Sequence, residues 1–208
     1  WSPRDAPVER RRELGLGEKF VVLYIGAHGI SQGLETVLKS AKQLTQHQEI
    51  QFVFVGEGAR KDELVRQAGE MSLGNIQFLD AVDKETVRDY YALADVCLIP
   101  LRKIPLFETF IPSKMFEIMA MSRPIVASLR GEAADILERS GGALITEPED
   151  SQGIAQAIRA LFNNRERARA MGSRARDFVI AHYSRRSLAA EYALLLDEAI
   201  AEFNSIHR

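Results

Sequence analysis

Short apolar segments alternate along this chain with segments of helical periodicity, and several of them end at glycine or proline. Two of them, residues 20–25 and 95–99, consist mainly of β-branched and other apolar side chains, as is typical of strands buried on both faces. Four further segments have the same character: residues 51–55, 76–79, 124–128 and 142–146. The pattern predicts an α/β fold with a doubly wound, mainly parallel six-stranded sheet of the Rossmann type, between two layers of helices.

The segments between the predicted strands carry apolar residues every three or four positions, the spacing of one helix face. Helices are predicted over residues 33–44, 59–71, 83–93 and 113–121, from residue 149, over 165–182 and from residue 184. No element is assigned to residues 129–141. Asp83 and Ser113 are of the residue types that cap a helix N-terminus.

The predicted elements define the domain organisation. Residues 1–17 contain proline and several arginines, which predicts a linker. Residues 18–208 hold all the strands and helices and are predicted to form one domain. Because the chain starts at Trp1 rather than methionine, we expect a fragment of a longer protein or a processed product.

The composition argues against several classes of protein. The 208 residues include 27 Lys and Arg against 29 Asp and Glu, so the net charge of −2 provides no cationic excess for binding nucleic acid. No apolar run approaches the ~20 residues that span a bilayer, so no transmembrane segment is expected. Cys97 is the only cysteine, which excludes an internal disulfide and a cysteine-based zinc site.

Ligands of open α/β sheets bind at the carboxyl ends of the strands. The first predicted strand is followed by Gly26, Gly29 and Gly33, and then by a helix. Such a loop lets backbone N–H groups and the helix N-terminus approach a phosphate. The glycine spacing matches neither the dinucleotide-binding pattern nor the P-loop, so a tight turn explains it equally well.

Other residues at the strand ends also have two interpretations. His28 either contacts a phosphate or sugar hydroxyl or fills space in the fold. Gly56 and Glu57 either line a nucleotide pocket or form a connecting turn. Lys114 lies at a helix start, where the helix dipole disfavours a cation unless an anion is near, and its alternative is a solvated side chain. Glu117 is suited to accept two ribose hydroxyls, or it faces solvent.

The order of these loops resembles the C-terminal domain of retaining GT-B glycosyltransferases of family 4 (group 1), over roughly residues 14–202. The most specific match is KMFEIMAMSRPIVA, from Lys114 to Ala127, which is similar to the helix and strand beside the donor ribose in that family. The resemblance implies a domain that binds a nucleotide-sugar donor, expected to be a UDP-sugar. It also implies a separate N-terminal acceptor-binding domain, and no metal or other cofactor.

Transferred to this chain, the resemblance implies a donor site at several strand ends. It places Gly26, His28 and Gly29 beside the diphosphate or sugar, Gly56 and Glu57 along the nucleotide pocket, Ala81 and Val82 at the base, and Glu117 at the ribose.

The chain departs from the family pattern at the diphosphate. Ala27 and Gln32 stand where the family commonly has an arginine and a lysine. Our hypothesis is that Lys114 supplies part of the lost positive charge, with Arg102 or Lys103 from the preceding loop in reserve.

Two further departures concern catalysis and the base. Thr109 stands at the first of two family glutamates and Glu108 lies next to it, so either of them, together with Lys114, is a candidate catalytic residue. Asp80 replaces a common glycine after the third strand.

The sequence therefore predicts the donor half of a glycosyltransferase that retains the anomeric configuration and serves cell-surface polysaccharide or glycoconjugate synthesis in bacteria. The resemblance extends to a subset that transfers amino- or deoxysugars. We expect a cytoplasmic protein, peripheral to the membrane where the acceptor is a lipid-linked sugar, and a fragment that is inactive without its acceptor domain. Two alternatives stay open: a non-catalytic nucleotide-sugar-binding module, and a sugar-nucleotide epimerase or phosphorylase of the same architecture.

Overall fold

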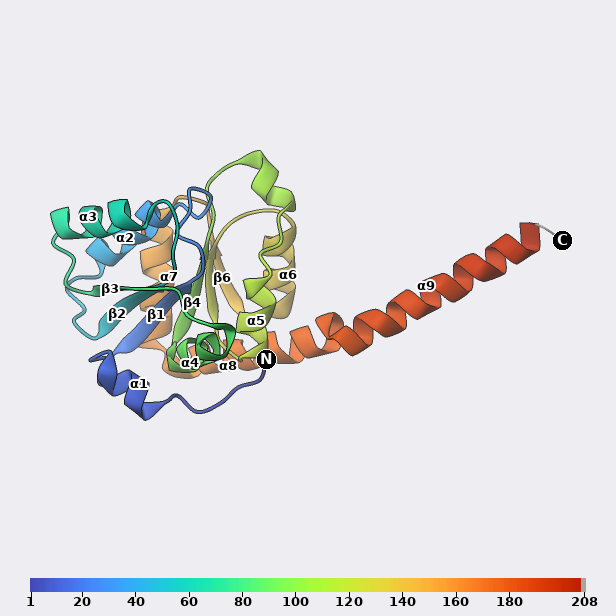
Figure 1. Ribbon diagram of the computed structural model, residues 1–208, viewed down its shortest axis with the longest axis horizontal. Coiled ribbons are helices and arrows are strands. Elements are labelled where there is room, and N and C mark those ends of the chain that lie inside the picture. The colour runs from blue at the N-terminus through green and yellow to red at the C-terminus, as the bar shows by residue number, and fades with distance from the viewer. Residues whose placement is uncertain (207–208) are drawn as a thin grey trace.

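A computed structural model describes residues 1–206 and is built around one sheet (Figure 1). Its strands are β1 (Phe20–Ile25), β2 (Ile50–Val55), β3 (Ile76–Leu79), β4 (Val96–Pro100), β5 (Ile125–Ser128) and β6 (Ala143–Thr146). All neighbours pair in parallel, in the order β3-β2-β1-β4-β5-β6. The predicted doubly wound sheet of six strands is confirmed, and every predicted strand end lies within one residue of the observed one.

Helices cover both faces of the sheet. They are α1 (Val8–Glu13), α2 (Leu34–Gln43), α3 (Lys61–Glu70), α4 (Lys84–Leu93), α5 (Lys114–Ala120), α6 (Glu132–Ser140), α7 (Ser151–Asn163), α8 (Arg165–Tyr183) and α9 (Arg185–Ile206), with a 3₁₀ helix η1 (Pro105–Thr109). Apolar residues of α2, α3 and α7 pack on one face, and those of α4, α5 and α6 on the other. Helix α8 contributes to both cores, which completes the predicted three layers.

Strand β1 shows how one sequence fills two cores. Because successive side chains of a strand point to opposite faces, Phe20, Val22 and Tyr24 pack toward α2, α3 and α7. Val21 and Leu23 pack toward α4, α5 and α6. All six residues of β1 are buried, which explains why its sequence is apolar throughout.

Helix α6 was missed by the sequence analysis. It has only nine residues between Gly131 and Gly141, but Ala133, Ile136 and Leu137 give it a buried face against the sheet. A helix this short carries too few repeats of the apolar pattern to stand out from a loop.

The two predicted caps had different outcomes. Asp83 caps α4 as predicted, since its carboxylate accepts a hydrogen bond of 2.8 Å from the backbone N–H of Thr86. Ser113 occupies the N-cap position of α5, but its side chain makes no capping hydrogen bond. Its backbone already has helical dihedral angles (φ −55°, ψ −32°), unlike the extended backbone of a usual capping residue.

Residues 1–17 pack against the domain. Their prediction as a linker did not include this packing. Arg11 donates hydrogen bonds of 2.5 Å and 2.6 Å to the carbonyl oxygens of Gly17 and Lys19. Leu16 is buried in the core, and the Trp1 ring lies edge-on to Tyr91 with centroids 5.7 Å apart. These contacts join the segment to the start of β1 and to α4.

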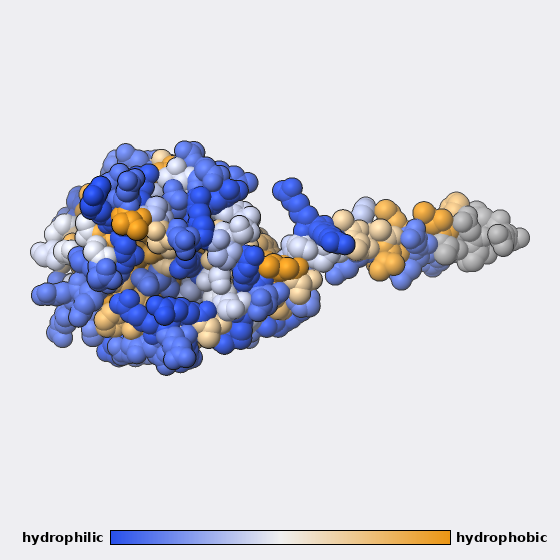
Figure 2. Space-filling view, turned by 90° about the horizontal axis from the view of Figure 1, so that it is seen from below, coloured by the Kyte–Doolittle hydropathy of each residue, from blue (hydrophilic) through white to orange (hydrophobic). Residues whose placement is uncertain are grey.

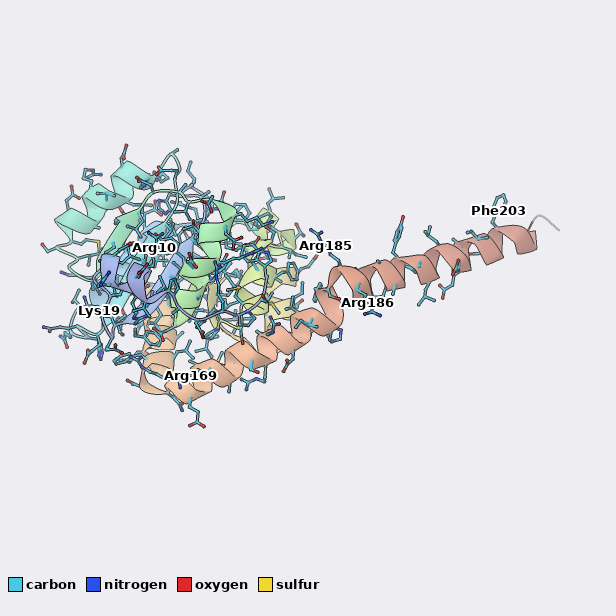
Figure 3. All side chains as sticks on the ribbon, turned by 60° about the horizontal axis from the view of Figure 1, so that its bottom comes forward. Arg10, Lys19, Arg169, Arg185, Arg186 and Phe203 are labelled. Atoms are coloured by element: carbon cyan, nitrogen blue, oxygen red, sulfur yellow. The ribbon has the colours of Figure 1, made fainter. Side chains whose placement is uncertain are left out.

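Helix α9 extends away from the rest of the protein (Figures 1 and 2). It begins after Ser184, whose extended backbone (ψ 148°) interrupts the helical path of α8. Large apolar side chains along it are exposed, including Leu188, Tyr192, Ile200 and Phe203, the last labelled near its far end in Figure 3. Within residues 1–206, no helix has both the length and the apolar composition needed to cross a membrane. The last two residues of the predicted domain, 207–208, lie outside the described part.

The substitution Leu38→Ala tests the core on the α2 side. Leu38 is 0% exposed, so we expect the free energy of unfolding to fall by about 2–5 kcal/mol. Denaturant unfolding measures the change. Leu194 on α9 is 63% exposed, and Leu194→Ala serves as the control, with an expected change within about 0.5 kcal/mol. Equal effects of the two substitutions would contradict the assigned core.

Candidate functional site

The carboxyl ends of β1, β2 and β4 bring three loops to one edge of the sheet: residues 26–33, 56–60 and 101–113. Strands β1 and β4 are neighbours, and the chain leaves them toward opposite sides of the sheet, so this is the point where the strand order reverses. Open α/β sheets have their ligand crevice at this point.

The first two loops fit together through glycine. Gly26 and Gly56 have φ values of 141° and 145°, and a Cβ on Gly56 would collide with the carbonyl oxygen of Gly26. A Cβ on Gly58 would come within 2.5 Å of the carbonyl oxygen of His28. The backbone N–H groups of Gly26 and His28 donate to the carbonyl oxygens of Val55 (2.9 Å) and Glu57 (2.8 Å). These glycines are therefore explained by loop packing, and the two N–H groups are already bonded.

Gly29 differs from these glycines. Its Cβ position is crowded only by Oε1 of the flexible Gln32 side chain, at 2.8 Å. Its backbone therefore accepts a side chain more easily than Gly26 or Gly56.

His28 is completely buried, at 0% exposure. Its ring centroid lies 5.8 Å, 6.1 Å and 6.3 Å from those of Tyr24, Phe54 and Phe78. Within residues 1–206, neither ring nitrogen has a hydrogen-bond partner. Burial lowers the pKa of His28 to about 4, with further lowering from the positive charges of Lys61 and Lys114. The imidazole is therefore neutral near pH 7 and fills space among the aromatic rings.

Lys114 extends from the start of α5 to the end of β1. Its Nζ donates a hydrogen bond of 2.9 Å to the carbonyl oxygen of Ile25 and lies 4.4 Å from the centroid of the Tyr24 ring. It also lies 2.5 Å from the position that a Cβ on Gly26 would occupy. Burial lowers the pKa of Lys114 to about 8, against a raising effect of Glu117. A cation is thus placed beside Gly26.

Glu117 lies less than one helical turn after Lys114 and is half-buried. Its Oε2 accepts a hydrogen bond of 3.3 Å from the hydroxyl of Tyr91. It also lines a cavity of about 540 Å³ between α4, α5 and the C-terminal helices, together with Lys84 and Arg88. Within residues 1–206, the carboxylate therefore has one hydrogen-bond partner, and it faces open space as well.

Lys61 is a cation at this edge that the sequence analysis missed. Its Nζ lies 2.6 Å from Glu57 Oε1 and 2.7 Å from Asp80 Oδ1, so it joins the ends of β2 and β3. The hydrogen bonds to Asp80 and Glu57 raise the pKa of Lys61, and the same contact with Lys61 lowers the pKa of Asp80. Glu57 lies in the loop before α3, so the helical spacing rule gives no signal for this pair. Ala81 and Val82, predicted to contact the base, follow directly in the chain.

Glu108 and Thr109 lie in η1, whose backbone at Glu108 packs against Gly131 of the turn after β5. The Thr109 hydroxyl donates 3.2 Å to the carbonyl oxygen of Leu106. Glu108 lines a cavity of about 350 Å³ that is also lined by Lys103 and Arg130. The structure thus brings Lys114, Gly26, His28, Gly56 and Glu57 together, while Glu108 and Thr109 pack on the β5 side of this edge. No group of three or more His, Cys, Asp or Glu residues suited to a metal ion occurs within residues 1–206.

The chain matches the sequence profile of glycosyl transferases group 1 over residues 7–178. It is 31% identical over 160 residues to WcaI of Escherichia coli K12, a glycosyl transferase assigned provisionally to colanic acid biosynthesis; the match covers 74% of this chain and 39% of that protein.

Two solved structures have the same fold. Sucrose-phosphate synthase from Thermosynechococcus elongatus matches with a TM-score of 0.79 and 24% identity, over 97% of this chain and 50% of that one. HepE from Anabaena, solved with UDP and glucose, matches with a TM-score of 0.79 and 19% identity, over 91% of this chain and 51% of that one. The chain spans about half, or less, of the length of these proteins.

Gly56→Ala tests the contact between the glycine loops. The added Cβ meets the Gly26 carbonyl oxygen at a φ that alanine rarely adopts, so we expect a loss of about 2 kcal/mol or more in unfolding free energy. Gly69→Ala is the matched control, because its Cβ position is open and alanine favours the helix by about 0.5–1 kcal/mol. Denaturant unfolding of both variants is the measurement; a neutral Gly56→Ala would contradict the interlocked loops.

His28→Leu tests the unpartnered imidazole. Removing two unsatisfied ring nitrogens is expected to raise the unfolding free energy at pH 7 by about 0.5–2 kcal/mol. Because the pKa of His28 is lowered from 6.5 to about 4 in the folded state, the unfolded chain binds more protons between these values. Wild-type stability should therefore fall as the pH drops through this window, and fall less in His28→Leu. The exposed His182 gives the control His182→Gln, whose pH profile should follow the wild type.

Proposed function

Because the chain belongs to the glycosyl transferases group 1 family, we propose that it is the donor-binding part of a glycosyltransferase that transfers a sugar, with retention of configuration, from a nucleotide-sugar to an acceptor. The observation that carries the proposal is the placement of Lys114 Nζ beside Gly26 at the end of β1, with Glu117 following on the same helix. A cation and a carboxylate at one strand end suit a diphosphate and a ribose.

In the proposed complex, the donor diphosphate lies over the end of β1, where Lys114 meets its charge. Glu117 accepts hydrogen bonds from the ribose hydroxyls, which fits a half-buried carboxylate that already faces open space. The base lies over Ala81 and Val82, beyond the Lys61 contacts. Lys114 neutralises part of the diphosphate charge, without a metal ion or other cofactor.

In the proposed reaction, the anomeric carbon loses its bond to the diphosphate oxygen and gains a bond to the acceptor oxygen on the same face of the sugar. The acceptor hydroxyl gives its proton to the departing diphosphate oxygen. The negative charge that develops on the departing diphosphate is stabilised by a cation already in place, which is the most effective form of electrostatic catalysis. Lys114 has this role, and Glu108 or Thr109 is proposed to contact the transferred sugar.

We propose a UDP-sugar as the donor, supported by the crystal structure of HepE with UDP and glucose on the same fold. The acceptor is proposed to bind a further domain, which accords with a chain about half the length of its relatives. We also propose a lipid-linked sugar acceptor at the cytoplasmic face of the membrane. A role in surface polysaccharide synthesis is supported by the similarity to WcaI, which is assigned provisionally to colanic acid biosynthesis.

One observation favours a second candidate, a nucleotide-sugar-binding module without catalysis. Ala27, Gln32 and Thr109 lack the charges that the family pattern has at these positions. Product analysis with the full-length protein separates the candidates. A glycoside of retained configuration supports the transferase, binding without turnover supports the module, and an epimerised sugar nucleotide indicates an epimerase.

Lys114→Met tests the proposed cation by calorimetry with UDP, GDP and ADP. Loss of a partly buried lysine–phosphate contact of about 1.5–3 kcal/mol should weaken the Kd of UDP about 10- to 100-fold. Because the pKa of Lys114 is about 8, UDP binding to the wild type should also weaken as the pH rises through 8, and the variant should lose this step.

Lys39→Met, on the exposed side of α2, is the matched control and should bind UDP as the wild type does. Unchanged UDP binding by Lys114→Met would refute the role of Lys114. Failure of the wild type to bind any of the three nucleotides would refute the proposed function itself.

A further inference from the structure

Two arginines from different loops converge on one carboxylate at the start of α2. Arg60, just before α3, places Nη2 2.5 Å from Glu35 Oε1. Arg102, just after β4, places Nη2 3.3 Å from the same oxygen. Glu35 thus connects the β2 and β4 loops through α2, the helix that follows the glycine loop.

Both arginines are also fixed to the backbone around the glycine loop. Arg102 Nε donates 2.8 Å to the carbonyl oxygen of Ile30, and its Cγ would be 3.1 Å from a Cβ on Gly33. The backbone N–H of Arg60 donates 2.9 Å to the carbonyl oxygen of His28. The Arg102 guanidinium group and the Arg60 backbone therefore lie against the loop that precedes α2.

The cluster is only partly closed to solvent. The side chains of Glu35, Arg60 and Arg102 are 20%, 27% and 33% exposed. Glu63, in the first turn of α3, also pairs with Arg60 at 3.0 Å. Arg102 also lines the cavity of about 350 Å³ to which Lys103 and Arg130 contribute, so open space adjoins this residue.

We propose that Glu35 is an internal counter-ion that occupies Arg102 and Arg60 until a diphosphate group competes for them. The inference rests on the proposed function. It adds Arg102 to Lys114 as a second group that binds the donor diphosphate. Ala27 and Gln32 leave the glycine loop without side-chain cations, and Arg102, from the β4 loop, crosses onto that loop. A diphosphate held by Lys114 at the end of β1 is met on its other side by Arg102, which exchanges its contact with Glu35 for a bidentate contact with phosphate.

Glu35 is thereby a positioning residue: it holds Arg102 and Arg60 in place, and its carboxylate competes with the diphosphate for them. A carboxylate that only held the loops in place would, on removal, disorder them and weaken nucleotide binding. A competing carboxylate would, on removal, leave Arg102 and Arg60 free for the ligand and strengthen binding. The sign of the change in affinity separates the two roles.

The test is calorimetric titration of the chain with UDP at low and high salt. Glu35→Gln is expected to tighten the Kd about three- to tenfold at low salt, and less at high salt, while lowering the melting temperature. Arg102→Gln is expected to weaken binding, and the double variant Glu35→Gln/Arg102→Gln should lose the tightening.

Glu70→Gln is the matched control, because it removes the same charge from an exposed pair with Arg66 on α3 and should leave the Kd unchanged. Weaker or unchanged binding by folded Glu35→Gln, or equal tightening by Glu70→Gln, would overturn the inference.

Glu35→Asp, which keeps the charge but shortens its reach, is the second variant if Glu35→Gln does not fold. It should tighten UDP binding about twofold. If the wild type binds no nucleotide, the proposed function fails; if it binds and neither variant tightens, the inference alone fails.

Discussion

The close approach of the Gly26 and Gly56 backbones is the constraint on which the candidate site depends. It lets the β1–β2 hydrogen-bond pattern continue beyond the strands into both loops, through the bonds of Gly26 to Val55 and of His28 to Glu57. These bonds fix the position of both loops at the ends of β1 and β2. Lys114 extends from α5 to this position and donates to the carbonyl oxygen of Ile25. A side chain at Gly56 would separate the loops and remove the surface over which Lys114 lies.

The packing of the two glycine loops also buries polar side chains where few hydrogen-bond partners are available. His28 follows Gly26 closely in the chain, and the loop conformation directs its ring between Tyr24 and Phe54. An imidazole without hydrogen bonds costs stability that an apolar side chain would not. Lys114 is also partly desolvated, but it has a carbonyl oxygen and an aromatic face as partners. Of these two buried nitrogen bases, only Lys114 carries charge near pH 7.

The fold could be predicted well because its signal is local. Each strand of the parallel sheet is a mainly apolar run, and the elements that escaped are the short helices α6 and η1 and the packed N-terminal segment. Of the candidate site, only the relative placement of residues on one segment, such as Lys114 and Glu117 on α5, follows from the sequence, and their roles stay predictions. The contacts of Lys61 with Asp80, and of Glu35 with Arg102, join residues whose proximity depends on the strand order and on side-chain direction, which periodicity does not contain. For the same reason the sequence could not decide whether His28 is buried in the fold or contacts a phosphate or sugar hydroxyl.

The position of a cation on the fold affects how it binds an anion. A lysine on a glycine-rich loop must lose both loop and side-chain freedom when it meets a phosphate. Lys114 stands on a helix whose Met115, Ile118 and Met119 are buried, and its Nζ is already held by a carbonyl oxygen. Much of its ordering entropy is therefore lost on folding rather than on binding, which is the advantage of preorganisation. In the proposed complex, this helix-borne lysine would offset part of the charge missing at Ala27 and Gln32 through its fixed position, so that a diphosphate would be bound with fewer cations on the loop itself.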